Sequence, residues 1–169
     1  MKNRIVIIGM PGCGKTTIGR MLAEELSMKF YDMDEYIENM TSKTISELFE
    51  KGENHFRNKE TLACRQLVRY NNILISTGGG IIKRNINIDI LKEEALIIFL
   101  DRPIEKIISD IDISKRPLLK EGKEKLLKLY EQRYELYKKA ADEIILNDGN
   151  IEDVIIKFKD IINENINLD

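Results

Sequence analysis

The stretch Gly9-Met10-Pro11-Gly12-Cys13-Gly14-Lys15-Thr16 carries the strongest structural signal in this sequence. It fits the pattern G-x-x-x-x-G-K-[ST], in which glycines allow backbone N–H groups to close around phosphate oxygens. The apolar run 5–8 precedes it and an amphipathic stretch, 16–26, follows it. A phosphate loop requires this order of strand, loop and helix, so the sequence predicts a nucleoside triphosphate site.

Each residue type in the loop has a chemical task. Lys15 supplies positive charge to the β- and γ-phosphates, and Thr16 offers a hydroxyl group to Mg²⁺. Cys13 is expected mainly as a small residue in a crowded turn. The residues of this segment that we expect to bind the nucleotide are Gly12, Cys13, Gly14, Lys15, Thr16 and Thr17.

Short apolar runs recur along the rest of the chain. Nearly continuous runs, typical of strands covered on both faces, occur at 5–8, 73–75, 96–100 and 144–146, with a weaker one at Phe30-Tyr31. Helical periodicity lies between them, at 16–26, 53–70, 104–108, 123–140 and 151–162. This alternation predicts a doubly wound α/β fold: one three-layer α/β/α domain over 1–169, with a mostly parallel five-stranded sheet.

Two local signals support the predicted helices. Thr44-x-x-Glu47 reads as a capping box, in which each residue satisfies a backbone N–H group of the other. Pro103 stands where proline is tolerated, in the first turn of a helix.

The composition argues against several classes of function. A formal charge of -2 provides no basic excess for a nucleic-acid backbone, and no apolar run approaches the ~20 residues of a membrane span. Two cysteines without CxxC spacing and a single histidine, His55, support neither a disulfide framework nor a zinc site. We expect a cytoplasmic monomer that acts on small molecules.

Two carboxylates, Asp32 and Asp34, follow the second predicted strand. On alternate positions of an extended stretch, both would face the crevice at the carboxyl end of the sheet, where ligands bind in such folds. Paired carboxylates there suit Mg²⁺ coordination and a base for an acceptor hydroxyl. Helix capping ahead of Glu35 explains an Asp-x-Asp pattern equally well on spacing alone.

A glycine turn and an arginine between two helices are also expected at the crevice at the carboxyl end of the sheet. Gly78-Gly79-Gly80 follows the strand at 73–75, at the end of the sheet where ligands bind. Arg116 ends a polar stretch between two helices, and we expect a mobile lid at about 109–120 that brings this cation to the transferred phosphoryl group. Arg57, considered alone, reads as a solvated surface charge.

The phosphate loop alone leaves more than one class of protein open. A GTPase would need the base-reading pattern N-K-x-D, but Asn58-Lys59 continues with Glu60 and Thr61. A nucleotide-binding module without catalysis is not excluded by the length of the chain. An enzyme would form ADP in the presence of an acceptor, whereas such a module would bind ATP without turnover.

Six motifs occur in one order over almost the whole chain, and together they resemble the shikimate kinase family of P-loop kinases. They are Gly-x-x-x-x-Gly-Lys-Thr at 9–16, Asp32-Met33-Asp34, Phe56-Arg57-x-x-Glu60, Gly78-Gly79-Gly80, Arg116-Pro117-Leu118-Leu119, and Arg133-x-x-Leu136-Tyr137 before Ala141-Asp142. The resemblance implies Mg²⁺-dependent transfer of the γ-phosphoryl group of ATP to the 3-hydroxyl of shikimate, in aromatic amino acid biosynthesis. A related small-molecule kinase, of the gluconate or nucleoside monophosphate type, is the alternative enzyme.

The same resemblance implies a role for each motif residue. Arg57 and Arg133 look like a clamp for the substrate carboxylate, a task that suits paired guanidinium groups. Asp34 would orient or deprotonate the attacking hydroxyl, and Asp32 would serve the hydrated Mg²⁺ together with Thr16. The implied catalytic residues are Lys15, Asp34 and Arg116; the implied substrate-binding residues are Asp34, Arg57, Gly78, Gly79, Gly80 and Arg133, in a region that includes about 32–60.

The lid departs from the pattern of the family. Members commonly carry a second arginine seven residues before that of R-P-L-L, and the corresponding residue here is Ser109. Asp110 and Asp112 place negative charge near the ATP phosphates, which is unfavourable unless these carboxylates face solvent or the lid packs differently. The family also uses the loop after the last strand to hold the adenine, here near 147–150.

Overall fold

A parallel five-stranded sheet forms the centre of the computed structural model, which describes residues 2–110 and 119–166. The strands are β1 (Arg4–Ile8), β2 (Lys29–Asp32), β3 (Ile73–Ser76), β4 (Ala95–Asp101) and β5 (Glu143–Leu146), in the order β2-β3-β1-β4-β5. Each neighbouring pair is parallel, and Val6 of β1 lies opposite Ile75 on one side and Ile97 on the other. The five predicted strands are confirmed.

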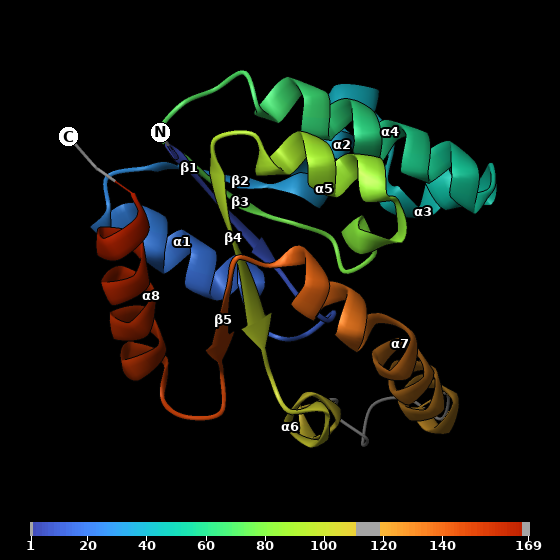
Figure 1. Ribbon diagram of the computed structural model, residues 1–169. Helices are drawn as coiled ribbons and strands as arrows, with labels where there is room; N and C mark the ends of the chain where they lie inside the picture. The colour runs from blue at the N-terminus through green and yellow to red at the C-terminus, as the bar shows by residue number, and fades with distance from the viewer. Residues whose placement is uncertain (1, 111–118, 167–169) are drawn as a thin grey trace.

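Helices cover both faces of this sheet (Figure 1). They are α1 (Lys15–Glu25), α2 (Met33–Thr41), α3 (Ile45–Glu50), α4 (Glu53–Leu67), the 3-10 turn η1 (Ile81–Lys83), α5 (Asn85–Lys92), α6 (Ile104–Ser109), α7 (Leu119–Ala140) and α8 (Ile151–Asn165). Helices α1 and α8 lie together on one face, whereas α5 and α7 pack against β4 from the other. This arrangement confirms the predicted three-layer α/β class.

The inner strands carry most of the core. Every side chain of β1 and β3 is buried, and so is β4 as far as Leu100. The edge strand β5 differs, because Ile144 and Leu146 remain 47% and 43% exposed. Side chains at alternate positions of a strand share one face, so the face of β5 that carries Ile144 and Leu146 is uncovered while Ile145 is buried on the other, and the expectation that this run is covered on both faces is wrong.

Some helix boundaries differ from the predicted ones. The sequence shows no clear helical periodicity at α5, because isoleucines alternate with polar residues there in the manner of a strand. Pro103 is the residue before α6 rather than part of its first turn. The capping box at Thr44 is confirmed: its hydroxyl accepts from the Glu47 N–H group at 3.2 Å, and its own N–H donates to the Glu47 carboxylate at 2.7 Å.

The strand order determines where a ligand can bind. β1 lies at the centre of the sheet, between β3 and β4, and its carboxyl end leads into the phosphate loop. Parallel strands present all their carboxyl ends at the same edge, so the residues that follow β1, β2 and β3 meet there. The sheet therefore assembles the predicted site from segments far apart in sequence.

Candidate active site

The phosphate loop connects β1 to α1 through a backbone that only glycine readily adopts. Gly14 directly precedes α1 with φ of 100°, and a Cβ atom at Gly9 would lie 2.7 Å from the carbonyl oxygen of Leu100. The Lys15 side chain is buried, and its Nζ donates hydrogen bonds of 2.9 Å to the carbonyls of Gly9 and Met10. The loop therefore holds a cation and the amino end of a helix in one place, as phosphate binding requires.

Asp32 caps a helix with one carboxylate oxygen and contacts the phosphate loop with the other. Its Oδ1 accepts hydrogen bonds from the N–H groups of Asp34 and Glu35, at 3.0 and 3.2 Å, so it caps α2. Its Oδ2 accepts a bond of 2.7 Å from the Thr16 hydroxyl, which also lies 3.4 Å from the Ser76 hydroxyl. One carboxylate thus starts a helix and contacts the phosphate loop.

Asp34 reaches the crevice by a different route from the expected one. The expectation of an extended stretch through Asp32 and Asp34 is wrong, because α2 begins at Met33 and Asp34 belongs to its first turn. The carboxylate nevertheless faces the glycine turn, since a Cβ atom on Gly78 would lie 3.2 Å from its Oδ1. Burial and the neighbouring charge of Asp32 raise the pKa of Asp34, and the Lys15 ammonium opposes that shift.

The glycine turn is wedged between the phosphate loop and Arg57. Thr77 anchors it to β1 by donating from both its N–H group and its hydroxyl to the carbonyl of Ile7, at 3.1 and 3.0 Å. A Cβ atom at Gly79 would lie 2.7 Å from Cδ of Pro11, and one at Gly80 would overlap the Arg57 guanidinium group. Only residues without a side chain allow these three segments to approach so closely.

Arg57 is buried rather than solvated, so its interpretation as a surface charge is wrong. Its Nη1 donates to both carboxylate oxygens of Glu60 at 2.9 Å, and its Nε donates to Glu53 at 3.3 Å. Glu60 is fully buried, and this burial raises its pKa while the Arg57 charge lowers it. The two carboxylates hold the guanidinium group in a defined orientation beneath Gly80.

Tyr137 connects α7 to the glycine turn. Its ring is fully buried, and its hydroxyl donates a hydrogen bond to the carbonyl of Gly79. Burial raises the pKa of Tyr137 to about 12, and the positive charges of Arg133 and Arg57 both act in the opposite direction. Arg133, one turn earlier on α7 and half-buried, is therefore near the same end of the site as Arg57.

A cavity of about 560 Å³ unites most of the predicted residues. Its lining is Pro11, Gly12, Gly14, Lys15, Thr16, Thr17, Asp32, Asp34, Thr77, Gly78, Gly79 and Arg102. Among the described residues, Arg57, Gly80 and Arg133 lie outside this lining, and Cys13 is buried behind the loop with a raised thiol pKa caused by that burial. Arg116 and lid residues 111–118 lie outside the described part of the chain.

Glu60, Tyr137 and Arg102 belong to the site, although the sequence alone gives them no role there. Glu60 and Tyr137 stand within two of the family motifs, so the sequence marked their positions. It did not show that Glu60 orients Arg57 or that Tyr137 holds the glycine turn. Arg102, which follows β4, has no motif to mark it. These three roles arise from packing between distant segments.

A second cavity, of about 310 Å³, lies beside the first. Gly14 and Thr17 line both cavities, and the loop after β5 closes the far side of the second. Asn147 in that loop donates a hydrogen bond of 2.8 Å from Nδ2 to the carbonyl of Cys13. The loop expected near the adenine therefore contacts the phosphate loop directly.

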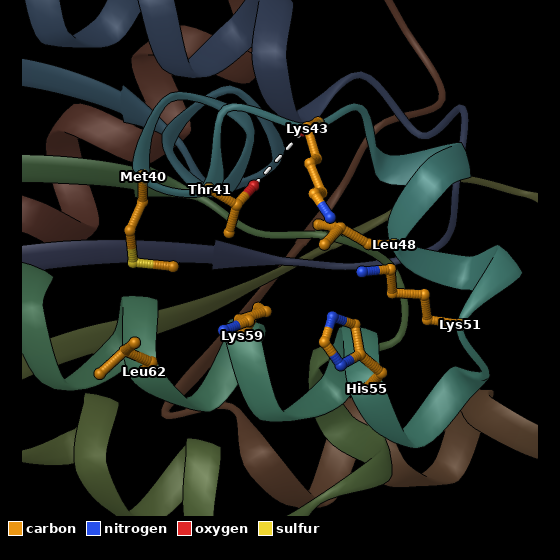
Figure 2. A pocket seen from close by; sticks show the side chains of 8 residues that line it. All are labelled: Met40, Thr41, Lys43, Leu48, Lys51, His55, Lys59 and Leu62. Atoms are coloured by element: carbon orange, nitrogen blue, oxygen red, sulfur yellow. Dashed lines mark hydrogen bonds between the residues drawn. The ribbon is translucent and has the colours of Figure 1, made fainter.

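A third cavity, of about 410 Å³, lies between α2, α3 and α4 (Figure 2). Its lining is Met40, Thr41, Lys43, Leu48, Lys51, His55, Lys59 and Leu62. The side chains of Lys43 and Lys51 approach each other there, and the hydrogen-bonding contact with Lys43, followed by its charge, lowers the pKa of Lys51. Because it shares no lining residue with the other two cavities, we assign the chemistry to the crevice at the phosphate loop.

Comparisons with known proteins identify the family of this chain. A sequence profile described as shikimate kinase matches residues 11–163. A shikimate kinase of Clostridium beijerinckii is 61% identical over 99% of both chains, and one of Clostridium botulinum is 57% identical over 98% of this chain and 100% of its relative. Both relatives span essentially the whole length of this chain.

Solved structures support the same assignment. The shikimate kinase from Acinetobacter baumannii in complex with shikimate has a TM-score of 0.87 at 35% identity, covering 98% of this chain and 95% of its own. The shikimate kinase from Aquifex aeolicus has a TM-score of 0.84 at 33% identity, with 96% and 97% covered. This chain belongs to the shikimate kinase family.

Proposed function

We propose that the protein transfers the γ-phosphoryl group of ATP to the 3-hydroxyl of shikimate, forming shikimate 3-phosphate and ADP in aromatic amino acid biosynthesis. The observation that carries this proposal is the single crevice in which the phosphate loop faces Asp34 and the glycine turn. Family membership supports it, as does the related structure from Acinetobacter baumannii, which is a complex with shikimate.

The acceptor end of the site suits a small hydroxy acid. Arg57 and Arg133 provide guanidinium groups for a carboxylate, and Glu60 keeps Arg57 in a fixed orientation. Asp34 is the group we assign to the ring hydroxyls, as hydrogen-bond acceptor and base for the attacking oxygen. The backbone of Gly78, Gly79 and Gly80 would offer N–H groups on the same side.

The donor end of the site suits a triphosphate. Lys15 lies within the loop, where it would contact the β- and γ-phosphates, and the N–H groups that begin α1 would bind the same anion. We assign Arg116, from the lid, to the charge that develops on the transferred phosphoryl group. Phosphoryl transfer has a loose transition state, so placement and charge matter more than a strong base.

The residues at the loop fit a magnesium ion. Among residues 2–110 and 119–166 there is no cluster of three His, Cys, Asp or Glu side chains, so an all-protein cage is absent there. The Thr16 hydroxyl beside the Asp32 carboxylate fits the smaller donor set that Mg²⁺ uses when phosphates and waters complete its shell. When bound, the ion would neutralise charge on the β- and γ-phosphate oxygens.

We also propose that the protein acts as a cytoplasmic monomer with one domain over 1–169. The described residues that line the crevice lie in loops and helix starts around one sheet, which favours a site built within a single subunit. The net charge of -2 favours small-molecule partners over nucleic acid. In the part of the chain that the structure describes, no helix is long and apolar enough to cross a membrane.

Acceptor-dependent ADP release tests this function. ATP and Mg²⁺ are supplied with shikimate, gluconate or nucleoside monophosphates as separate acceptors. The expected result is turnover with shikimate alone, yielding shikimate 3-phosphate identified by phosphorus NMR. Turnover with another acceptor would retain the kinase chemistry and overturn the substrate, and ATP binding without turnover on any acceptor would indicate a binding module.

A further inference from the structure

Arg102 occupies a position between the two nucleotide-side cavities that the proposed mechanism does not use. Its side chain lines both the cavity at the phosphate loop and the cavity beside Asn147. The other residues shared by both linings are Gly14 and Thr17, at the start of α1. A nucleotide that fills both cavities, with phosphates in the first and base in the second, has to pass between α1 and Arg102.

The backbone around Arg102 is held from several sides. Asp101, the last residue of β4, accepts a hydrogen bond of 2.6 Å at its carbonyl from the N–H group of Asn147. The carboxylate of Asp101 accepts another, of 2.8 Å, from the Tyr134 hydroxyl. Pro103 follows with its restricted φ and leads into α6. Arg102 is therefore presented by the sheet itself, in contrast to a cation carried on a lid.

The side chain of Arg102 has unused hydrogen-bonding capacity. Its Nη2 forms an ion pair of 2.6 Å with Oδ2 of Asp110, and its side chain is 24% exposed. Its Nε is buried and has no hydrogen-bond partner within residues 2–110 and 119–166. Because buried N–H groups are almost always paired in folded proteins, this one shows that the contacts among the described residues leave donor capacity of the guanidinium group unused.

The ion pair with Arg102 also bears on the expected repulsion between Asp110 and the ATP phosphates. Asp110 does not face the phosphates as an isolated negative charge, because Arg102 compensates it at 2.6 Å. Ser109 bonds back to the carbonyl of Lys106 at 2.8 Å, so its side chain is occupied within α6. Among residues 2–110 and 119–166, the cationic side chains that line the phosphate cavity are Lys15 and Arg102.

We propose that Arg102 binds the nucleotide by donating from its guanidinium group to the phosphate next to the ribose, while Asp110 orients the side chain. A guanidinium group has five N–H donors in a planar fork, so it can serve one carboxylate and one phosphate together. The proposal rests on the proposed use of ATP. It adds an ATP contact supplied by the residue after β4 to those of the phosphate loop and the lid.

Three variants test the role of Arg102. Arg102→Met removes the charge, Arg102→Lys keeps it without the fork, and Arg20→Met is the matched control. Arg20 is an exposed arginine on α1 that also pairs with a carboxylate, Glu35, at 2.6 Å. Loss of a charge-assisted contact predicts a rise of about tenfold in the KM for ATP in Arg102→Met and about threefold in Arg102→Lys. The KM for shikimate and both constants of Arg20→Met are expected to stay within about twofold of wild type.

A direct measurement of nucleotide binding distinguishes a failure of this proposal from a failure of the proposed function. Calorimetric titration with ADP and Mg²⁺ needs no acceptor, so a wrong substrate assignment would leave the measurement intact. Unchanged ADP affinity in a folded Arg102→Met, or in Arg102→Lys if the first variant does not fold, would overturn the role of Arg102. Competitive inhibition by tripolyphosphate, which has no base, is expected to weaken by the same factor as ATP binding, and an unchanged inhibition constant would overturn the phosphate contact.

Discussion

Replacing Gly79 by alanine tests whether the glycine turn and the phosphate loop touch as closely as the structure indicates. The added Cβ atom would lie 2.7 Å from Cδ and 2.8 Å from Cγ of Pro11. Carbon atoms normally approach to about 3.5 Å, so the two segments would have to separate by about 0.8 Å. A proline ring cannot rotate away, and the displacement would pass into both backbones.

The expected cost follows from this displacement. Overpacking of this kind destabilises a protein by about 2 kcal/mol, which lowers Tm by about 4–8 °C for a chain of this length. Misplacing the acceptor side of the site by almost 1 Å is expected to lower kcat by about 100-fold. Calorimetry measures the first effect, and a coupled assay for ADP release measures the second.

Gly149→Ala is the control for stability, because no atom lies within 4 Å of the Cβ position at Gly149. Its Tm is expected to stay within about 2 °C of wild type. If Gly79→Ala matched that control in Tm and retained wild-type kcat, the close approach of the turn to Pro11 would be refuted.

Three further predictions concern the acceptor side of the site. Asp34→Asn is expected to lower kcat about 100-fold with little change in the KM for ATP. Burial raises the pKa of Asp34, so wild-type activity should fall on acidification at a higher pH than for an ordinary aspartate, and the asparagine variant should lack this limb of the pH–rate profile. Arg57→Ala is expected to raise the KM for shikimate and also to destabilise the fold by about 3–5 kcal/mol, because Glu60 would remain buried without its counter-charge; unchanged values of both Tm and KM would contradict its two roles. Tyr137→Phe removes the hydrogen bond to Gly79 and should lower Tm by about 2–4 °C, as measured by calorimetry, and an unaltered Tm would show that this bond contributes nothing.

Features set by short stretches of chain were predictable from the sequence. The phosphate loop depends on glycines at fixed spacing and on the strand and helix beside it, all of which are close together in the sequence. The inner strands were predicted from their continuous apolar runs, which occur because β1, β3 and β4 are buried on both faces. The capping box at Thr44 is likewise a contact between neighbours in sequence.

Local sequence patterns were less informative where a residue's role depended on elements distant in sequence. Arg57 reads as a surface charge in a helix, and only its burial between Glu60 and the glycine turn gives it a fixed orientation. The helix α5 was not evident in the sequence, because its isoleucines alternate with polar residues in a pattern typical of a strand. Spacing alone left two interpretations of Asp32; the structure confirms that its Oδ1 caps α2, and its Oδ2 contacts Thr16 of the phosphate loop.

The sequence by itself determined the phosphate loop, the α/β class and, through the order of six motifs, the family. The tertiary structure alone decided that Glu60 orients Arg57, that Tyr137 holds the glycine turn, and that Arg102 borders both nucleotide-side cavities. The physical reason is the range of the interactions. Backbone conformation and hydrophobic periodicity are set by near neighbours, whereas burial, ion pairing and close backbone approach appear only when a parallel sheet brings its strand ends together.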